Sequence, residues 1–237
     1  MLSKFLRAAA RAKGIQYVGG YVEGLLGSTN NITVTLTSLT GGLATQPAAG
    51  DFVIVYFGIG APNNNKTPVI SGYTELVLLK QADTESITLL VAHKFMTGTP
   101  DTSITLINGT ENTADAGAVY ISVWRNVNTT TPFDVTQTTS QSSNSVLANP
   151  PAITPVTTGA IIVAGGAGAH NRGVQTYSSS DLTGFLSAGG DDSNNATIGG
   201  GYNVWTSGSF DPAQFTFSST DSTNFSRAAV TLALRPA

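Results

Sequence analysis

Residues 51–58 read DFVIVYFG, a run of apolar residues that opens directly after Gly50. A short continuous run rich in β-branched and aromatic residues is typical of a strand covered on both faces. Upstream, residues 31–38 read NITVTLTS, in which Ile, Val and Leu alternate with Thr. That period of two predicts a strand with one dry and one solvated face. The two patterns together indicate sheets, some strands of which are fully enclosed.

Similar patterns recur along most of the chain. Apolar or alternating runs predict further strands at 74–80, 86–96, 117–125, 160–166 and 227–234. Less regular runs predict strands near 17–25, 102–107, 182–187, 201–206 and 213–218. Turn residues such as Asn108-Gly109 and Gly189-Gly190 separate them. Many short strands without intervening helices favour two packed antiparallel sheets. We therefore expect an all-β, two-sheet antiparallel sandwich with jelly-roll-like connectivity, although other Greek-key sandwiches share this pattern.

The domain organisation depends on one polar segment. Residues 128–159 are rich in Pro, Thr and Ser, and they form either a linker between two domains or an excursion across one sandwich. We favour the excursion, because residues 160–237 alone offer few core strands. No clear sequence repeat relates the two halves. The expectation is thus a single sandwich domain over residues 15–237.

Composition excludes several classes of protein. Charged residues make up 11% of the 237 residues, against roughly 25% in ordinary globular chains. Cysteine is absent, which excludes disulfides and thiolate metal sites. The net charge is −3, so no large basic face for nucleic acid is expected. No apolar run of about 18 residues exists to cross a membrane as a helix. We expect neither nucleic acid nor membrane among the partners.

The N-terminus differs in composition from the rest. Residues 2–13 read LSKFLRAAARAK, with helix-forming alanines, basic side chains and no acid. This predicts a basic helical arm over residues 1–14. A short helix needs a surface for its apolar stripe, which is either its own domain or a partner subunit. The side chains that we expect to dock on a partner are Leu2, Phe5, Leu6, Arg7 and Arg11.

No motif for catalysis or for a cofactor is evident. His93 lies in a predicted strand, and His170 follows a glycine-rich stretch, AGGAGA. That stretch lacks the G-x-G-x-x-G spacing of a dinucleotide loop, and no G-x-S-x-G elbow is present. We expect no enzyme activity and no cofactor.

Two groups of residues are candidates for ligand binding. Asp191 and Asp192, in the sequence DDSNN, are candidate calcium ligands, although we favour a solvated turn over a metal site here. Tyr202 and Trp205 lie beside Asn and Ser in GGGYNVWTSG. Aromatic rings next to amides stack on sugars, so these two residues are the candidate glycan-binding side chains. Ordinary strand packing is the alternative.

Several segments resemble a family of phage-associated β-sandwich proteins. They are GDFVIVYFGIG, GYTELVLLK, SITLLVAHKFMTG, GAVYISVWRNVNTTTPFDV and AAVTLALRPA. The family features are a strand opened by Gly-Asp and a terminal strand ending in Leu-Arg-Pro. The resemblance covers residues 45–237 and implies a virion component of the head or tail. It implies no catalytic residues.

These observations lead to one expected function and one alternative. The expected function is a virion structural protein, displayed as a head decoration, fibre or tail-associated component. Its partners would be other virion proteins and further copies of itself. The alternative is a carbohydrate-binding or adhesion module that recognises a glycan on the host surface.

Overall fold

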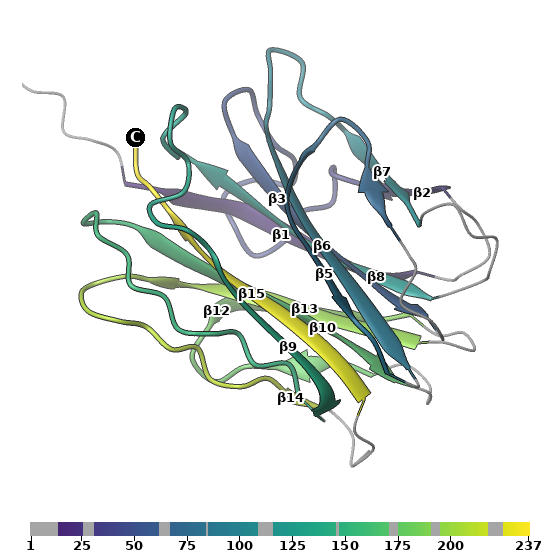
Figure 1. Ribbon diagram of the computed structural model, residues 1–237. Coiled ribbons are helices and arrows are strands. Elements are labelled where there is room, and N and C mark those ends of the chain that lie inside the picture. Colours follow the sequence, from purple (N-terminus) through teal and green to yellow (C-terminus); the bar gives the residue numbers. More distant parts are fainter. Residues whose placement is uncertain are drawn as a thin grey trace, which may run out of the picture.

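The computed structural model describes most of the chain outside its N-terminal arm and several loops. The described residues are 14–25, 31–61, 67–83, 85–108, 116–145, 147–170, 175–190, 195–217 and 225–237. Within them every regular element is a strand, and the strands pair antiparallel (Figure 1). The prediction of an all-β protein is confirmed. The predicted helix over residues 2–13 lies outside the described residues.

The first large sheet comes entirely from the first half of the chain. It has five strands in the order β1-β8-β3-β6-β5. The bounds are β1 Gln16–Leu25, β3 Phe52–Ala61, β5 Thr74–Gln81, β6 Ser86–Phe95 and β8 Gly117–Arg125. The apolar run at 51–58 forms most of β3, which lies in the middle of the sheet. The prediction of an enclosed central strand is therefore confirmed.

The second large sheet comes entirely from the second half. Its five strands have the order β12-β13-β10-β15-β9. The bounds are β9 Thr138–Ser145, β10 Ile161–His170, β12 Thr183–Gly189, β13 Asn195–Val204 and β15 Phe225–Leu234. The polar segment 128–159 thus supplies an edge strand, β9. The sequence predicts no strand there, because TTSQSSNS has no apolar period.

The two large sheets pack face to face and form a sandwich (Figure 1). In the middle β3 lies against β10, while β1 lies against β12 and β5 against β9 at the two sides. Large side chains of the first sheet meet glycines of the second. The Tyr56 ring covers Gly165, and the Tyr120 ring covers Gly200. Because aromatic rings face bare backbone, the sheets interlock closely along their middle.

The two sheets repeat one strand order. The five strands of each large sheet can be numbered one to five in chain order. In both sheets their order in space is then one, five, two, four, three. The register repeats as well, since Phe52 faces Trp124 on the neighbouring strand and Ile161 faces Leu234. When the two halves are exchanged, β1 takes the place of β9, and β12 takes the place of β5. The contact between β1 and β12 then coincides with the contact between β9 and β5, as it would for a two-fold axis between the halves. The two halves therefore share strand order and register, although no clear sequence repeat relates them. We call this shared topology the duplication.

A shared turn opens the central strand of each half. Gly50 precedes β3 and Gly159 precedes β10, and both have φ +85°. This left-handed conformation is strained for other residues, so glycine is required at both places. The β5–β6 ladder also shifts register between Glu75 and Val77, as the β12–β13 ladder does between Thr183 and Leu186. The duplication therefore extends to local irregularities.

Each half carries a smaller outer layer on the side of its large sheet that faces away from the other half. The first outer layer is a three-stranded sheet in the order β2-β7-β4. Its bounds are β2 Asn31–Thr35, β4 Val69–Ile70 and β7 Ser103–Ile107. The second outer layer is the pair β11 Tyr177–Ser178 and β14 Thr216–Phe217, with a bridge between Ile153 and Phe210. The second outer layer is the smaller of the two.

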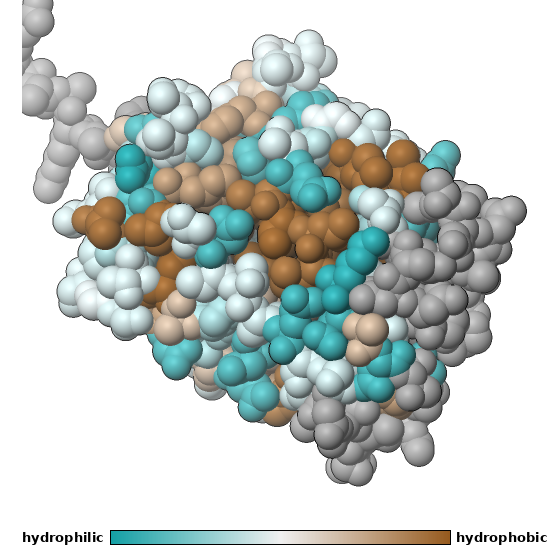
Figure 2. Space-filling view, viewed as in Figure 1, coloured by the Kyte–Doolittle hydropathy of each residue, from teal (hydrophilic) through white to brown (hydrophobic). Residues whose placement is uncertain are grey.

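The surface has few strongly polar areas. On the face seen in Figure 1, residues of intermediate hydropathy predominate, with an apolar area in the middle where β5 and β6 lie (Figure 2). Large apolar residues that are half or more exposed are scattered; in the described part of the chain they are Leu43, Val69, Val156 and Val204. A surface polar by hydroxyl and amide groups agrees with the low share of charged residues.

Candidate functional site

The two aromatic glycan candidates lie on opposite faces of the second large sheet. Tyr202 is directed into the sandwich, where its ring lies 4.9 Å from that of Tyr17 and 5.1 Å from that of Trp124. Trp205 packs on the outer side near Ile162, and its Nε1 donates to the backbone oxygen of Gly208 at 2.8 Å. The two rings therefore form no common platform for a sugar.

Two other sets of predicted site residues cannot be placed. Asp191 and Asp192, the candidate calcium ligands, lie outside the described residues. The same holds for the predicted docking side chains Leu2, Phe5, Leu6, Arg7 and Arg11. Both sets stay predictions from the sequence.

The two histidines are built into the fold. His93 is half-buried, with its ring 5.3 Å from that of Phe52 and 5.1 Å from that of Phe133. Burial lowers the pKa of His93, so its neutral form is favoured. His170 is buried, and its Nε2 lies 2.9 Å from Oγ1 of Thr197. Each imidazole is therefore packed against aromatic or hydroxyl neighbours as part of the fold.

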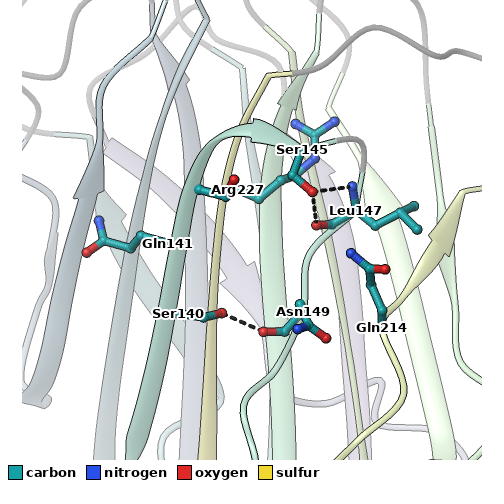
Figure 3. A pocket seen from close by; sticks show the side chains of 8 residues that line it. Ser140, Gln141, Ser145, Leu147, Asn149, Gln214 and Arg227 are labelled. Atoms are coloured by element: carbon teal, nitrogen blue, oxygen red, sulfur yellow. Dashed lines mark hydrogen bonds between the residues drawn. The ribbon is translucent and has the colours of Figure 1, made fainter.

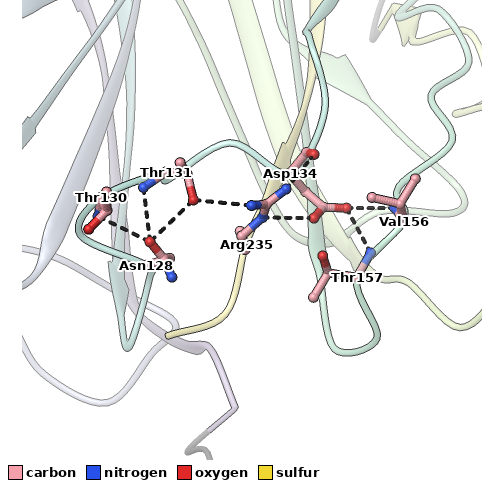
Figure 4. A network of polar contacts seen from close by, with 7 residues as sticks. All are labelled: Asn128, Thr130, Thr131, Asp134, Val156, Thr157 and Arg235. Carbon is pink, nitrogen blue, oxygen red and sulfur yellow. Dashed lines mark hydrogen bonds and ion pairs between the residues drawn. The ribbon is translucent and has the colours of Figure 1, made fainter.

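A polar network joins the C-terminus to the start of the second half (Figure 4). Nε of Arg235 donates to Oδ1 of Asp134 at 3.1 Å. Oδ2 of Asp134 accepts the backbone N–H groups of Val156 at 2.6 Å and Thr157 at 3.0 Å. Burial alone would raise the pKa of Asp134, but the hydrogen bonds from Thr157, Val156 and Arg235 together lower it. The ionised carboxylate of Asp134 thus links three segments of the chain. We call such an Asp–Arg pair, which holds strand ends together, a fastener.

The first half has a corresponding fastener. Arg125, at the end of β8, donates from Nε and Nη2 to the two carboxylate oxygens of Asp51, each at 2.8 Å. Asp51 also accepts the backbone N–H of Ala48 at 2.8 Å. The Gly-Asp and Leu-Arg-Pro features therefore have structural roles: Gly50 makes the turn, and Asp51 and Arg235 fasten strand ends.

A polar cavity lies beside β9, between this edge strand and the chain that follows it (Figure 3). Its volume is about 250 Å³. Apart from Leu147, its lining side chains are polar: Ser140, Gln141, Ser142, Ser145, Asn149, Gln214 and Arg227. Arg227 is 2% exposed and donates from Nη1 to the backbone oxygens of Ala169 and Ser226. The cavity therefore presents mainly hydrogen-bonding groups.

Hydrogen bonds within the cavity wall fix two of the hydroxyls. Oγ of Ser140 donates to the backbone oxygen of Asn149, and Oγ of Ser145 donates to that of Leu147 at 2.9 Å. The side-chain amides of Asn149 and Gln214 form no hydrogen bond with any residue that the structure describes. Both residues are exposed, so their amides are open to solvent and can offer donors and an acceptor to a ligand.

A second cavity of about 250 Å³ lies in the first half, lined by Gln46, Pro47, Thr99, Pro100, Asp101 and Thr102. Two prolines and an acid paired with Lys94 at 2.6 Å make this wall less suited to hydrogen bonding. It is of equal size and therefore serves as a natural control.

The described residues contain neither a cluster of metal ligands nor a helix that could span a membrane. They contain no group of three His, Cys, Asp or Glu side chains that could hold a metal ion. In the same part of the chain no helix has the length and hydrophobicity needed to cross a bilayer.

The sequence does not predict the cavity residues. Asn149 and Gln214 are separated by 65 positions and belong to no motif. They meet because the segment after β9 runs beside the segment before β14, where the backbone N–H of Phe215 donates to the oxygen of Ala148 at 3.0 Å. The polar composition of 128–159 is the one available signal.

Comparisons with known proteins identify no relative. No protein-family model, no curated protein and no solved structure matches the chain. The resemblance to phage-associated proteins therefore stays a prediction, and function has to be proposed from the fold and the cavity.

Proposed function

We propose that this protein is a structural component of a phage particle, exposed on the head or tail, and that it is not an enzyme. The observation that carries the proposal is the duplicated strand order. In an eight-stranded jelly roll, one sheet holds the first, eighth, third and sixth strands side by side, and the other holds the second, seventh, fourth and fifth. Here β1-β8-β3-β6 and β2-β7-β4 have these orders, with β5 beside β6 instead of β4.

Jelly rolls occur both in viral capsid proteins and in lectins, and a fold alone does not assign a function. Three further features support a structural role. Both buried aspartates that pair with arginine fasten strand ends, both histidines are packed into the fold, and the surface carries few charges. Side chains with little charge and little flexibility lose less entropy when they are ordered in a repetitive assembly.

The N-terminal arm is the proposed anchor. Leu2, Phe5 and Leu6 would bury an apolar stripe on another virion subunit, and Arg7 and Arg11 would meet its acidic groups. Because the arm precedes β1 at an edge of the first large sheet, it can reach a neighbour without disturbing the sandwich. Homo-oligomers with closed symmetry are the expected form.

Particle composition tests the proposal. Mass spectrometry of gradient-purified phage should find this protein in stoichiometric amounts, and gold-labelled antibodies should locate it on the head or tail. Deleting residues 1–13 should leave the far-ultraviolet circular dichroism spectrum of the sandwich intact and abolish incorporation. A Lys4→Ala/Lys13→Ala variant, which keeps the apolar stripe, should still be incorporated. Absence of the protein from purified particles would refute the structural role.

A second function, glycan recognition, is favoured by one observation. The cavity beside β9 gathers amide and hydroxyl groups, and two of its amides have no partner among the described residues. Recognition of a surface glycan is compatible with display on a particle. Glycan recognition is also possible without display on a particle, since a binding module needs no capsid.

A further inference from the structure

We infer that the cavity beside β9 binds a single uncharged sugar residue through Asn149 and Gln214. The inference rests on glycan recognition as the second proposed function. It moves the site from the aromatic pair Tyr202 and Trp205 to a region of the molecule that contains neither.

The size of the cavity favours a small ligand. Pockets for drug-sized ligands measure roughly 300–1,000 Å³. A volume of about 250 Å³ is smaller than that range. One sugar residue of a glycan would therefore enter, and the remaining residues would lie along the exposed β9 edge.

The chemistry of the wall favours hydroxyl groups. A sugar hydroxyl is one donor and an acceptor, and a side-chain amide supplies the complementary pair from its oxygen and nitrogen. In Figure 3 the side chains of Asn149 and Gln214 lie on one side of β9, the same side as Leu147. Gln141 extends to the other side of the strand and is not part of the proposed contacts.

The serines complete the polarity pattern. Ser140 donates its hydroxyl hydrogen to a backbone oxygen, so its lone pairs are available as acceptors. Oγ of Ser145 also accepts the backbone N–H of Leu147 at 3.2 Å, so one lone pair of this hydroxyl is left. A ligand rich in hydroxyl donors matches this wall. Arg227 donates to the backbone carbonyls of Ala169 and Ser226, and we assign it to holding the floor of the cavity.

The duplication locates the cavity within the second half. In the first half, β2 and β7 form a continuous ladder from Asn31–Ile107 to Thr35–Ser103, and aliphatic side chains such as Val34 and Leu106 fill the space beneath it. The outer layer of the second half is also filled, by an apolar cluster that includes Tyr177 and Phe215. The polar cavity therefore lies beside this cluster, at the β9 edge.

Ligand-observed NMR tests the inference. Saturation-transfer experiments would use the full chain with the methyl glycosides of glucose, galactose and N-acetylglucosamine at millimolar concentration. We expect at least one of them to bind. Asn149→Ala and Gln214→Ala should each weaken that binding by about threefold to tenfold, as expected for the loss of one or two neutral hydrogen bonds.

Two control variants make the outcomes distinguishable. Gln46→Ala, in the equal-sized cavity of the first half, should bind like the unmodified protein. If Trp205→Ala abolishes binding while both cavity variants bind normally, glycan recognition stands and its assignment to this cavity is wrong. If none of the glycosides binds, both the site and the second proposed function fail, while the structural role is still tested separately by the composition of the particle. Melting curves of each variant verify folding.

Discussion

The outer face of the first large sheet and that of the second are built on equivalent strands but filled differently. On β3 the outward side chains are Val53, Val55, Phe57 and Ile59, all in one apolar cluster. The equivalent positions on β10, aligned through Gly50 and Gly159, are Ile162, Ala164, Gly166 and Gly168. Where the first half has bulky side chains beneath a three-stranded layer, the second has small ones beneath two short strands.

This difference separates two roles within one duplicated fold. Bulky, fully buried side chains stabilise the first half by removing apolar area from water. Small residues on β10 let polar side chains such as Arg227 and Tyr177 lie close to the backbone, since a Cβ at Gly168 would overlap both. The first half is therefore expected to hold the larger share of the stability, and the second half to hold the polar cavity.

The largest expected effect comes from opening the first outer layer. Leu36 is completely buried in its apolar cluster. Leu36→Ala should lower the free energy of unfolding by about 2–5 kcal/mol, because a cavity replaces packed methyl groups. Leu147→Ala, in the wall of the second-half cavity, should lower it by about 1 kcal/mol or less. Urea unfolding measures both, and equal losses would contradict the division of roles.

The next effect concerns the fastener of the second half. Asp134→Asn removes the charge that pairs with Arg235 and should cost about 1.5–3 kcal/mol at neutral pH. Since the pKa of Asp134 is lowered by folding, its contribution is complete above the ordinary carboxyl pKa and is lost as pH falls through the folded value. The difference between variant and unmodified protein should therefore shrink below about pH 4. A pH-independent difference in chemical denaturation would contradict this assignment.

The seam between the two halves should tolerate no added bulk. A Cβ at Gly165 would lie 2.7 Å from the ring of Tyr56. Gly165→Ala is expected to destabilise the protein by about 1–3 kcal/mol through overpacking. Combining it with Tyr56→Leu should recover part of the loss, because the ring is removed. Additive losses in thermal melts would show that the two positions do not pack against each other.

The smallest effect is expected at the hydroxyl of Tyr56. It is buried between the sheets without a hydrogen-bond partner among the described residues, and burial raises the pKa of its hydroxyl. Tyr56→Phe should leave stability unchanged or raise it by up to about 1 kcal/mol, because an unsatisfied buried hydroxyl is removed. Tyr21→Phe is the control, since its hydroxyl donates to Glu23 at 2.7 Å and its loss should be slightly destabilising. A clear loss in Tyr56→Phe would reveal a partner for the hydroxyl, such as a buried water.

Strands with strong apolar patterns are predictable from the sequence. The less regular runs near 17–25 and 102–107 also correspond to strands, β1 and β7, whereas a strand without any apolar period is not predictable. The runs at 51–58, 117–125 and 227–234 correspond to β3, β8 and β15. β9 escapes prediction because Ser and Thr occupy both of its faces, and it is held by its ladder with β15. The glycines in the middle of β13 weaken its strand signal, and the bulk that covers Gly200 is supplied by Tyr120 across the seam.

The duplication is not visible in the sequence because the halves share strand order and register rather than residue identity. Phe57 and Gly166 occupy equivalent positions, as do Tyr56 and Gly165, and each pair differs in size as much as two residues can. The common signal is restricted to the glycine turn before β3 and β10 and to Arg125 and Arg235 at the ends of β8 and β15. Likewise, Asn149 and Gln214 meet through the course of two loops, which no local pattern encodes.

The assignment of each large sheet to one continuous half of the chain has a consequence for synthesis. Once Arg125 has left the ribosome, every strand of the first sheet has its neighbours, and pairing needs no residue still to come. Its face with Tyr56 and Tyr120 nevertheless stays open to water until β10 and β13 arrive. The nascent protein thus passes through a stage with a complete sheet and an uncovered aromatic face, when a chaperone or a neighbouring nascent chain has the best opportunity to bind it.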